Sequence, residues 1–280
     1  MSEATLGYLD AVVLGIVEGL TEFLPVSSTG HLTIAEKFLG LPVDARAVTA
    51  FTAIIQFGAI IATFLYFRSD ISRLLVAWVR GLASAEARTN PDYRFAWYVI
   101  AGSTPVVVVA ILTESLITGP LRSLWVVAVA LVLWSGVMWW AERRPSQRLG
   151  EKDLRLREVL GIGIVQCASL VPGVSRSGAT ISAGLLLGVD RVTATRLSFF
   201  LAIPALTGAG LFELPSIDPS VVGWGPLAVG TVVSFVVAYA SIAWLLRFVA
   251  RHPITFFVPY RIVAGLAIVV LLTTGVLTAT

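Results

Sequence analysis

The sequence predicts an all-α polytopic membrane protein, and two properties of the chain lead to this fold class. Hydrophobic residues make up 57% of the 280 positions and charged residues only 13%, whereas soluble domains carry about 25% charged residues. Apolar segments of about 20 residues, the length of a helix that spans the hydrocarbon core of a bilayer, recur along the chain. We therefore expect a single membrane domain over residues 1–280.

Six apolar segments are long enough to cross the membrane as full transmembrane helices. They are residues 47–67, 94–114, 121–141, 194–213, 222–248 and 257–279. A shorter segment, 71–83, has arginines at its flanks, and we expect it to form a helix at the membrane interface.

Two further apolar stretches, 8–40 and 156–189, do not fit continuous spans because proline and glycine interrupt each of them midway. The interrupting residues are Pro25 and Gly30 in the first stretch and Pro172, Gly173 and Gly178 in the second. Irregular backbone is tolerated within a membrane only where protein buries it or water reaches it. We therefore expect two re-entrant helix–loop–helix hairpins whose tips meet inside the protein.

The two broken stretches repeat each other. Residues 15–30 match residues 163–178 without a gap at an offset of 148, and the Leu-Gly pairs at 39–40 and 187–188 keep that offset. The chain is thus expected to contain repeat 1, about 1–145, and repeat 2, about 150–280. Three predicted spans separate the hairpins, so the second enters from the opposite face. This is an inverted-topology repeat, which places polar sites near the membrane midplane.

The basic residues orient this arrangement. If both hairpins return to the side from which they enter, sixteen basic residues of the segments 68–94, 143–157, 191–196 and 247–261, Arg261 included, share one side. The other side carries the basic residues Lys37, Arg46 and Arg122 and the acidic residues Glu114, Glu213 and Asp218. The positive-inside rule then predicts that both termini lie outside. Basic residues in short loops fit membrane orientation better than nucleic-acid binding, so we expect no nucleic-acid partner.

Two carboxylates mark the first hairpin. Glu18 and Glu22 are four residues apart and therefore share one face of a helix. Adjacent carboxylates in an apolar setting repel each other and are costly to bury. A divalent cation would relieve both penalties, and hard oxygen ligands suit Mg²⁺ or Ca²⁺. The alternative is a partly exposed polar face at a helix end.

Three hydroxyl residues, Ser27, Ser28 and Thr29, follow the first break, where a second short helix should begin. Such residues cap helices, and a helix start directs free N–H groups toward an anion. Small residues also let helices pack closely, which explains some of these hydroxyls without a site. His31 lies one turn after Ser28, and a serine beside a histidine is the minimal pair for an activated nucleophile. A lone histidine is more often a core residue.

The second hairpin carries Ser175, Arg176, Ser177 and Thr180 at its break. Hydroxyls and amides at a helix start, together with a guanidinium that matches phosphate oxygens bidentately, are typical of an anion-binding loop. The alternative, an arginine that snorkels to the interface, is disfavoured because Arg176 lies in the middle of the hairpin.

The repeats have diverged in their chemistry. Glu18 aligns with Gln166, Glu22 with Leu170, Ser28 with Arg176 and His31 with Ala179. One hairpin therefore keeps acids, a hydroxyl nucleophile and a histidine, while the other keeps a cation and hydrogen-bond donors. A metal ion, an arginine and a serine–histidine pair are what phosphoryl transfer from an anionic substrate requires.

At these residues the chain resembles the undecaprenyl-diphosphate phosphatase family associated with bacitracin resistance. The stretches 18–31 and 172–180 are similar to its two signature regions, and length, repeat and hydropathy agree over essentially the whole chain. The resemblance implies a bacterial inner-membrane enzyme that removes the terminal phosphate from a C55 polyprenyl diphosphate. The product is the monophosphate lipid carrier of cell-wall synthesis. Access from the periplasmic face is also implied, and a lipid substrate could enter laterally between helices.

The resemblance also implies roles for the matching residues. Glu18 and Glu22 would serve the metal and the diphosphate, Ser28 would be the nucleophile and His31 its acid/base partner. Arg176 would clamp the phosphates, and the substrate-binding hydroxyls would be Ser27, Thr29, Ser175, Ser177 and Thr180. Attack by Ser27 or by His31 itself stays open.

Other functions compete with this interpretation. Inverted repeats with broken helices are characteristic of secondary transporters, so a lipid transporter or flippase is the main alternative. A lipid phosphatase with a histidine nucleophile would need a second catalytic histidine, and only His252 remains, in a basic loop. A non-enzymatic scaffold would leave the intramembrane charges unexplained. The preferred metal, the accepted chain length and the oligomeric state, a homodimer included, are not determined by the sequence.

Overall fold

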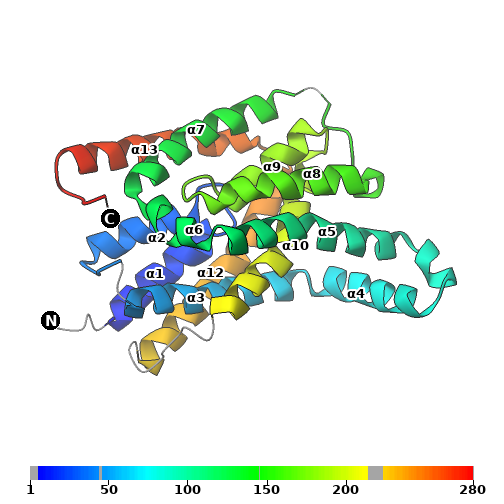
Figure 1. Ribbon diagram of the computed structural model, residues 1–280, viewed down its shortest axis with the longest axis horizontal. Coiled ribbons are helices and arrows are strands. Elements are labelled where there is room, and N and C mark those ends of the chain that lie inside the picture. Colours follow the sequence, from blue (N-terminus) through cyan, green and yellow to red (C-terminus); the bar gives the residue numbers. More distant parts are fainter. Residues whose placement is uncertain (1–5, 44–45, 145, 214–222, 280) are drawn as a thin grey trace.

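A computed structural model describes residues 6–43, 46–144, 146–213 and 223–279. In these residues the regular structure is helical apart from one isolated bridge between Leu149 and Val189 (Figure 1). Asp218, and the side chains of Arg46 and Glu213, for which an outside location is predicted, lie outside the described part of the chain.

Six helices of the described chain are long and apolar enough to cross a membrane. They are α3 (Arg46–Tyr66), α5 (Pro91–Leu112), α7 (Leu124–Glu142), α10 (Arg191–Glu213), α12 (Trp224–Val249) and α13 (Val258–Thr273), the last preceded by the 3₁₀ turn Ile254–Phe257. These helices coincide with the six predicted spans to within three residues at each end, except that α13 ends six residues before the predicted end at 279. The prediction of an all-α, multi-pass membrane protein is therefore confirmed.

The predicted interfacial helix corresponds to α4 (Arg68–Ala83), which packs against α5. Its buried positions include Leu74 and Ala77, and Arg73 forms ion pairs with Asp70 and Asp92. A short helix, α6 (Glu114–Thr118), follows α5. The location of α4 at a membrane surface stays a prediction.

Two pairs of short helices occupy the interrupted stretches. The first is α1 (Tyr8–Thr21) and α2 (Ser28–Phe38), and the second is α8 (Leu156–Gln166), a 3₁₀ turn (Cys167–Leu170) and α9 (Arg176–Leu186). The start of α8 lies 148 residues after the start of α1, and both the start and the end of α9 lie 148 residues after those of α2. The backbone repeats as well, since Gly40 and Gly188, at the same offset, have φ of 71° and 86° after their helices. The two segments that match in sequence therefore also correspond in their helix starts and in the backbone after their second helices.

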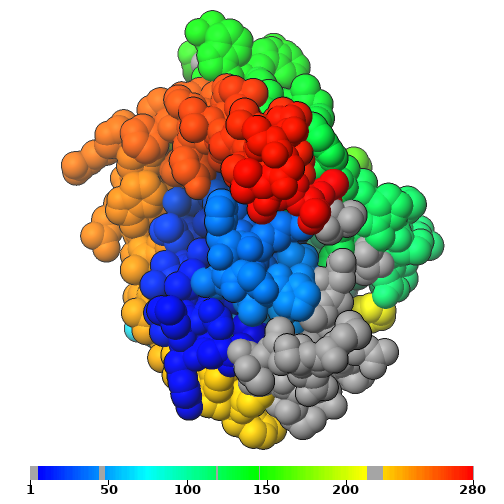
Figure 2. Space-filling view, turned by 90° about the vertical axis from the view of Figure 1, so that its left-hand side faces the viewer, coloured from blue at the N-terminus to red at the C-terminus, as the bar shows by residue number. Residues whose placement is uncertain are grey.

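Each pair returns to the end of the molecule from which it starts. Tyr8, at the start of α1, lies against Gly225, and Lys37, near the end of α2, donates a hydrogen bond to Thr278. Figure 2 looks onto this end, where the blue residues of α1 and α2 adjoin the red end of α13. The second pair also starts and ends at one place, because the amide of Asp190, after α9, bonds to the Leu149 carbonyl before α8.

The length of α12 separates these two ends. It begins beside Tyr8, and 26 residues later the carbonyl of Val249 accepts a hydrogen bond from Arg191, at the start of α10. At 1.5 Å per residue this helix is about 39 Å long. The α4–α5 connection lies on the right of Figure 1, and Arg196 of α10 pairs with Asp70 in the first turn of α4.

Glycines allow each pair to pack closely on a helix of the other half. Helix α1 packs on α12, where a Cβ on Gly15 would lie 2.6 Å from the carbonyl oxygen of Gly230. Helix α8 packs on α5, where a Cβ on Gly163 would collide with the carbonyl oxygen of Gly102. Small residues permit such close approach between helices in membranes. Gly15 and Gly163 are 148 residues apart, so the two contacts occupy corresponding positions in the two matching segments.

Candidate active site

The breaks in the two helix pairs meet in the interior of the molecule. The amide of Gly173, in the second break, donates a hydrogen bond of 3.0 Å to Ser27 Oγ in the first. Ser175 Oγ donates in the other direction, to the carbonyl of Leu24, at 3.5 Å. Phe23, fully buried beside these groups, packs edge-on against Phe199 of α10. The first break is therefore held both by the second break and by α10.

Two serines at equivalent positions adopt a strained backbone. Ser27 and Ser175, the N-caps of α2 and α9, have φ of 77° and 75°, the left-handed region that non-glycine residues rarely adopt. Such strain costs roughly 1–3 kcal/mol per residue and persists where the surroundings enforce it, most often at functional sites. Ser175 Oγ accepts a hydrogen bond from the Gly178 amide and lies 3.1 Å from Ser177 Oγ.

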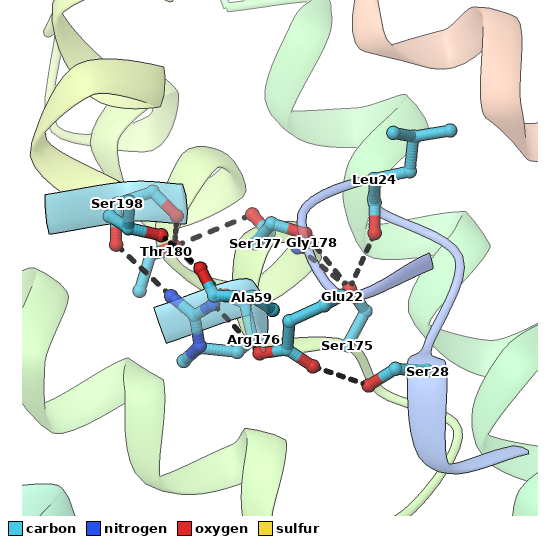
Figure 3. Close-up of polar contacts among 11 residues, drawn as sticks. Glu22, Leu24, Ser28, Ala59, Ser175, Arg176, Ser177, Gly178, Thr180 and Ser198 are labelled. Atoms are coloured by element: carbon cyan, nitrogen blue, oxygen red, sulfur yellow. Dashed lines mark hydrogen bonds and ion pairs between the residues drawn. The ribbon is translucent and has the colours of Figure 1, made fainter. Parts of the chain in front are cut away.

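The carboxylate of Glu22 forms hydrogen bonds to side chains of both helix pairs. Glu22 Oε1 accepts a hydrogen bond of 3.1 Å from Arg176 Nη2, and Glu22 Oε2 accepts one of 2.6 Å from Ser28 Oγ (Figure 3). Both ionic side chains are mostly removed from solvent, with 6% of Glu22 and 11% of Arg176 exposed. The guanidinium also donates to the carbonyl of Ser198 on α10. The structure thus brings together the predicted acid, nucleophile and phosphate clamp.

The predicted donor hydroxyls are distributed unequally around this centre. Ser177 and Thr180 are fully buried; the Thr180 hydroxyl donates to the carbonyl of Arg176 at 2.8 Å and lies within hydrogen-bond distance of Ser198 Oγ, at 2.7 Å. Its hydroxyl therefore fastens α9 to α10 and to its own helix. Thr29, in contrast, is exposed at the first turn of α2.

His31 does not pair with Ser28 as the spacing suggests. Its Nδ1 lies 2.7 Å from the Ser27 carbonyl, and its Nε2 lies 2.6 Å from the hydroxyl of Tyr260, on which the ring also stacks. A carbonyl only accepts hydrogen bonds, so Nδ1 carries a proton, and in the neutral ring Nε2 accepts from Tyr260. Ser28 is the first residue of α2 and its hydroxyl points back across the break to Glu22, whereas His31 faces α13.

The residues suit a cation beside Glu18. Glu18 is 2% exposed, and its Oε1 has no hydrogen-bond partner among the described atoms. A buried carboxylate oxygen one turn from a second carboxylate is the environment that a hard divalent cation relieves. Within the described ranges, no three or more His, Cys, Asp or Glu side chains lie together in a group that could hold a metal ion. Glu18 and Glu22 would therefore share the ion with hydroxyl, water or substrate oxygens.

Arg261 is the residue that the sequence interpretation misplaced. Counted with the basic residues of one surface, it is instead fully buried at the start of α13. Its guanidinium donates to the carbonyls of Pro25, Gly173 and Val174 and to Ser135 Oγ. The signal available in the sequence was its position inside the predicted span 257–279, where an arginine must find partners within the protein.

Comparisons with known proteins agree with the sequence resemblance. The family model described as bacitracin resistance protein BacA matches residues 11–267. Undecaprenyl-diphosphatase 1 of Streptomyces coelicolor is 57% identical over 278 residues, which cover 99% of each chain. The undecaprenyl-diphosphatases of Acidothermus cellulolyticus and of Mycobacterium sp. (strain KMS) are 56% and 45% identical, over 97% and 98% of this chain and 99% and 100% of theirs.

Proposed function

The chain belongs to the BacA family of bacitracin resistance proteins, and from this premise we propose that it is a membrane phosphatase of undecaprenyl diphosphate. It would hydrolyse the terminal phosphate and return undecaprenyl phosphate, the lipid carrier of cell-wall synthesis, in the bacterial inner membrane. One observation in the structure carries this proposal: the single carboxylate of Glu22 binds both the hydroxyl of Ser28 and the guanidinium of Arg176. A nucleophile, its base and an anion clamp thereby form one cluster.

The first step is an exchange of partners at Arg176. In the structure its guanidinium donates to Glu22. The terminal phosphate of a diphosphate lipid presents the same kind of anionic oxygen and can accept two parallel N–H bonds. Phosphate binding therefore releases Glu22 from its ion pair and leaves it bound to Ser28, the group that must lose a proton.

Ser28 then attacks the terminal phosphorus. Its Oγ–P bond forms as the bond from phosphorus to the bridging oxygen breaks, and undecaprenyl phosphate leaves. Glu22, already 2.6 Å from Ser28 Oγ, takes the hydroxyl proton as general base. Glu22 gives this proton up to solvent as the product leaves. Water then hydrolyses the phosphoserine: Glu22 takes a proton from the water and returns it to Ser28 Oγ as the Oγ–P bond breaks, which restores the Ser28 hydroxyl and releases inorganic phosphate. This assignment gives Glu22 the role of base that the sequence pattern had suggested for His31.

His31 has a supporting place in this scheme. Through Nδ1 it holds the carbonyl of Ser27, the strained residue directly before Ser28, and through Nε2 it binds Tyr260. These bonds fix the start of α2 relative to α13. A divalent cation on Glu18 and Glu22 would neutralise charge on the diphosphate oxygens and make the phosphorus more electrophilic.

The same proposal includes the membrane arrangement. The two helix pairs are re-entrant hairpins of an inverted repeat, with both termini on the periplasmic side. The return of each pair to its own end of the molecule, and the placement of the two starts at opposite ends, support this topology. Substrate would reach the site from the periplasmic side, as the family resemblance implies.

Phosphate release by the purified protein tests the function. In detergent, undecaprenyl diphosphate should give inorganic phosphate in the presence of Mg²⁺ or Ca²⁺, and a chelator should abolish the release. Activity that persists with chelator would remove the cation role of Glu18 and Glu22. Movement of the lipid between leaflets of a vesicle without any phosphate release would favour the transporter alternative.

A further inference from the structure

We propose that Arg261 is a positioning residue that sets the register between the two breaks and so holds Arg176 opposite Glu22. Arg261 lies in the first turn of α13 and is fully buried. It makes no hydrogen bond to Glu22, Ser28 or Arg176, so its effect on them passes through the backbone. The inference rests on the proposed function, because the register matters to a reaction that the two breaks share.

The guanidinium of Arg261 bonds to both halves of the repeat. Its Nη1 donates to the carbonyl of Pro25 at 2.8 Å, and its Nη2 donates to the carbonyls of Gly173 and Val174 at 2.8 and 3.1 Å. A break in a buried helix pair leaves carbonyl groups without helical partners, which is costly away from water. One planar fork satisfies three of these carbonyls at once and thereby fixes the distance between the breaks.

The remaining donor of the guanidinium, Nε, binds a side chain of helix α7. Arg261 Nε donates to Ser135 Oγ at 3.2 Å, and the fully buried Ser135 hydroxyl itself donates to the Leu131 carbonyl of α7. Helices α7 and α13 pack together, with Gly265 against the carbonyl of Ala128. Arg261 therefore fixes the position of the two breaks relative to helices α7 and α13 as well as relative to each other.

The bonded carbonyls lie next to the reacting groups. Pro25 precedes Ser27 and Ser28 by two and three residues, and Val174 precedes Arg176 by two. In these short segments, a shift of either carbonyl moves the groups that follow it. A displacement of about 1 Å in a catalytic arrangement can cost about 100-fold in rate. Lysine offers a single ammonium in place of the planar fork and cannot reproduce bonds to separate carbonyls and to Ser135.

Steady-state kinetics of Arg261→Lys in the phosphate-release assay test the inference. We expect kcat to fall by about 100-fold or more, with KM within about threefold of the wild-type value, because Arg176 still carries the charge that binds phosphate. Arg247→Lys, at an exposed position near the end of α12, is the matched control and should leave both constants unchanged. Thermal unfolding in the same detergent establishes that each variant is folded.

Chemical rescue separates register from folding. Arg261→Ala should regain at least about tenfold of its lost activity when guanidinium ion is added at millimolar concentration, and ammonium ion should not replace it. Wild-type turnover in folded Arg261→Lys would overturn the inference. Failure of both variants to fold would also overturn it, because arginine would then be required for folding and not for register. Absence of phosphate release from the wild-type protein would instead refute the proposed function itself.

Discussion

The buried ion pair between Glu22 and Arg176 predicts strong thermodynamic coupling between the two halves of the chain. The side chains are 6% and 11% exposed, and 3.1 Å separates Glu22 Oε1 from Arg176 Nη2. Removal of one partner leaves an uncompensated charge in the interior, at a cost of about 3–5 kcal/mol, whereas removal of both eliminates that charge. We therefore expect Glu22→Gln and Arg176→Met each to lower the free energy of unfolding by about 3–5 kcal/mol. The loss in the double variant should be smaller than the sum of the two single losses, by at least about 2 kcal/mol.

Reversible unfolding in mixed micelles, followed by tryptophan fluorescence, measures the four free energies of this cycle. The same cycle at Arg73 and Asp92 is the control, because that pair is 43% and 23% exposed and should couple by only about 0–1 kcal/mol. If the Glu22 and Arg176 changes prove additive to within about 0.5 kcal/mol, the two charges do not depend on each other and the reasoning from their burial is refuted.

Three further changes have definite expected outcomes. Ser28→Ala should lower phosphate release by about 10³-fold or more, since it removes the proposed nucleophile, and a near-normal rate would exclude that role. Tyr260→Phe keeps the ring stacked on His31 but loses their hydrogen bond, so kcat should fall only about 2- to 10-fold, and a larger loss would indicate a direct role of the hydroxyl in the chemistry. Gly163→Ala should lower the unfolding temperature sharply because its Cβ meets backbone, whereas Gly136→Ala, with open space around it, should not, and equal effects would contradict the close helix contact.

Helix placement was predictable because hydropathy and repetition are both local signals. The six spans followed from the length of apolar segments, and the offset of 148 residues anticipated the starts of α8 and α9 from those of α1 and α2. Proline and glycine marked both breaks. The meeting of the breaks followed from the polar residues that each contains, since such residues must find partners within the protein.

The pairing of side chains inside the site was harder to predict. Spacing alone suggested that Ser28 and His31 form a pair, but the hydroxyl of Ser28 follows the direction of the first helical residue and meets Glu22. His31 finds its partner 229 positions along the chain, in Tyr260. The interior position of Arg261 depends on carbonyls of both breaks. Every residue has a backbone carbonyl, so the sequence does not indicate which carbonyls will accept a hydrogen bond from an arginine.

The Glu22–Arg176 contact makes the two halves of this chain complementary rather than interchangeable. Position 22 corresponds to Leu170 and position 176 to Ser28, so neither half contains both charges. A symmetric assembly of two first halves would bring carboxylates together without a cation, and two second halves would bring guanidiniums together without a base. These differences therefore make a single covalent chain, or a strict one-to-one association of unlike halves, the arrangement in which this site is whole.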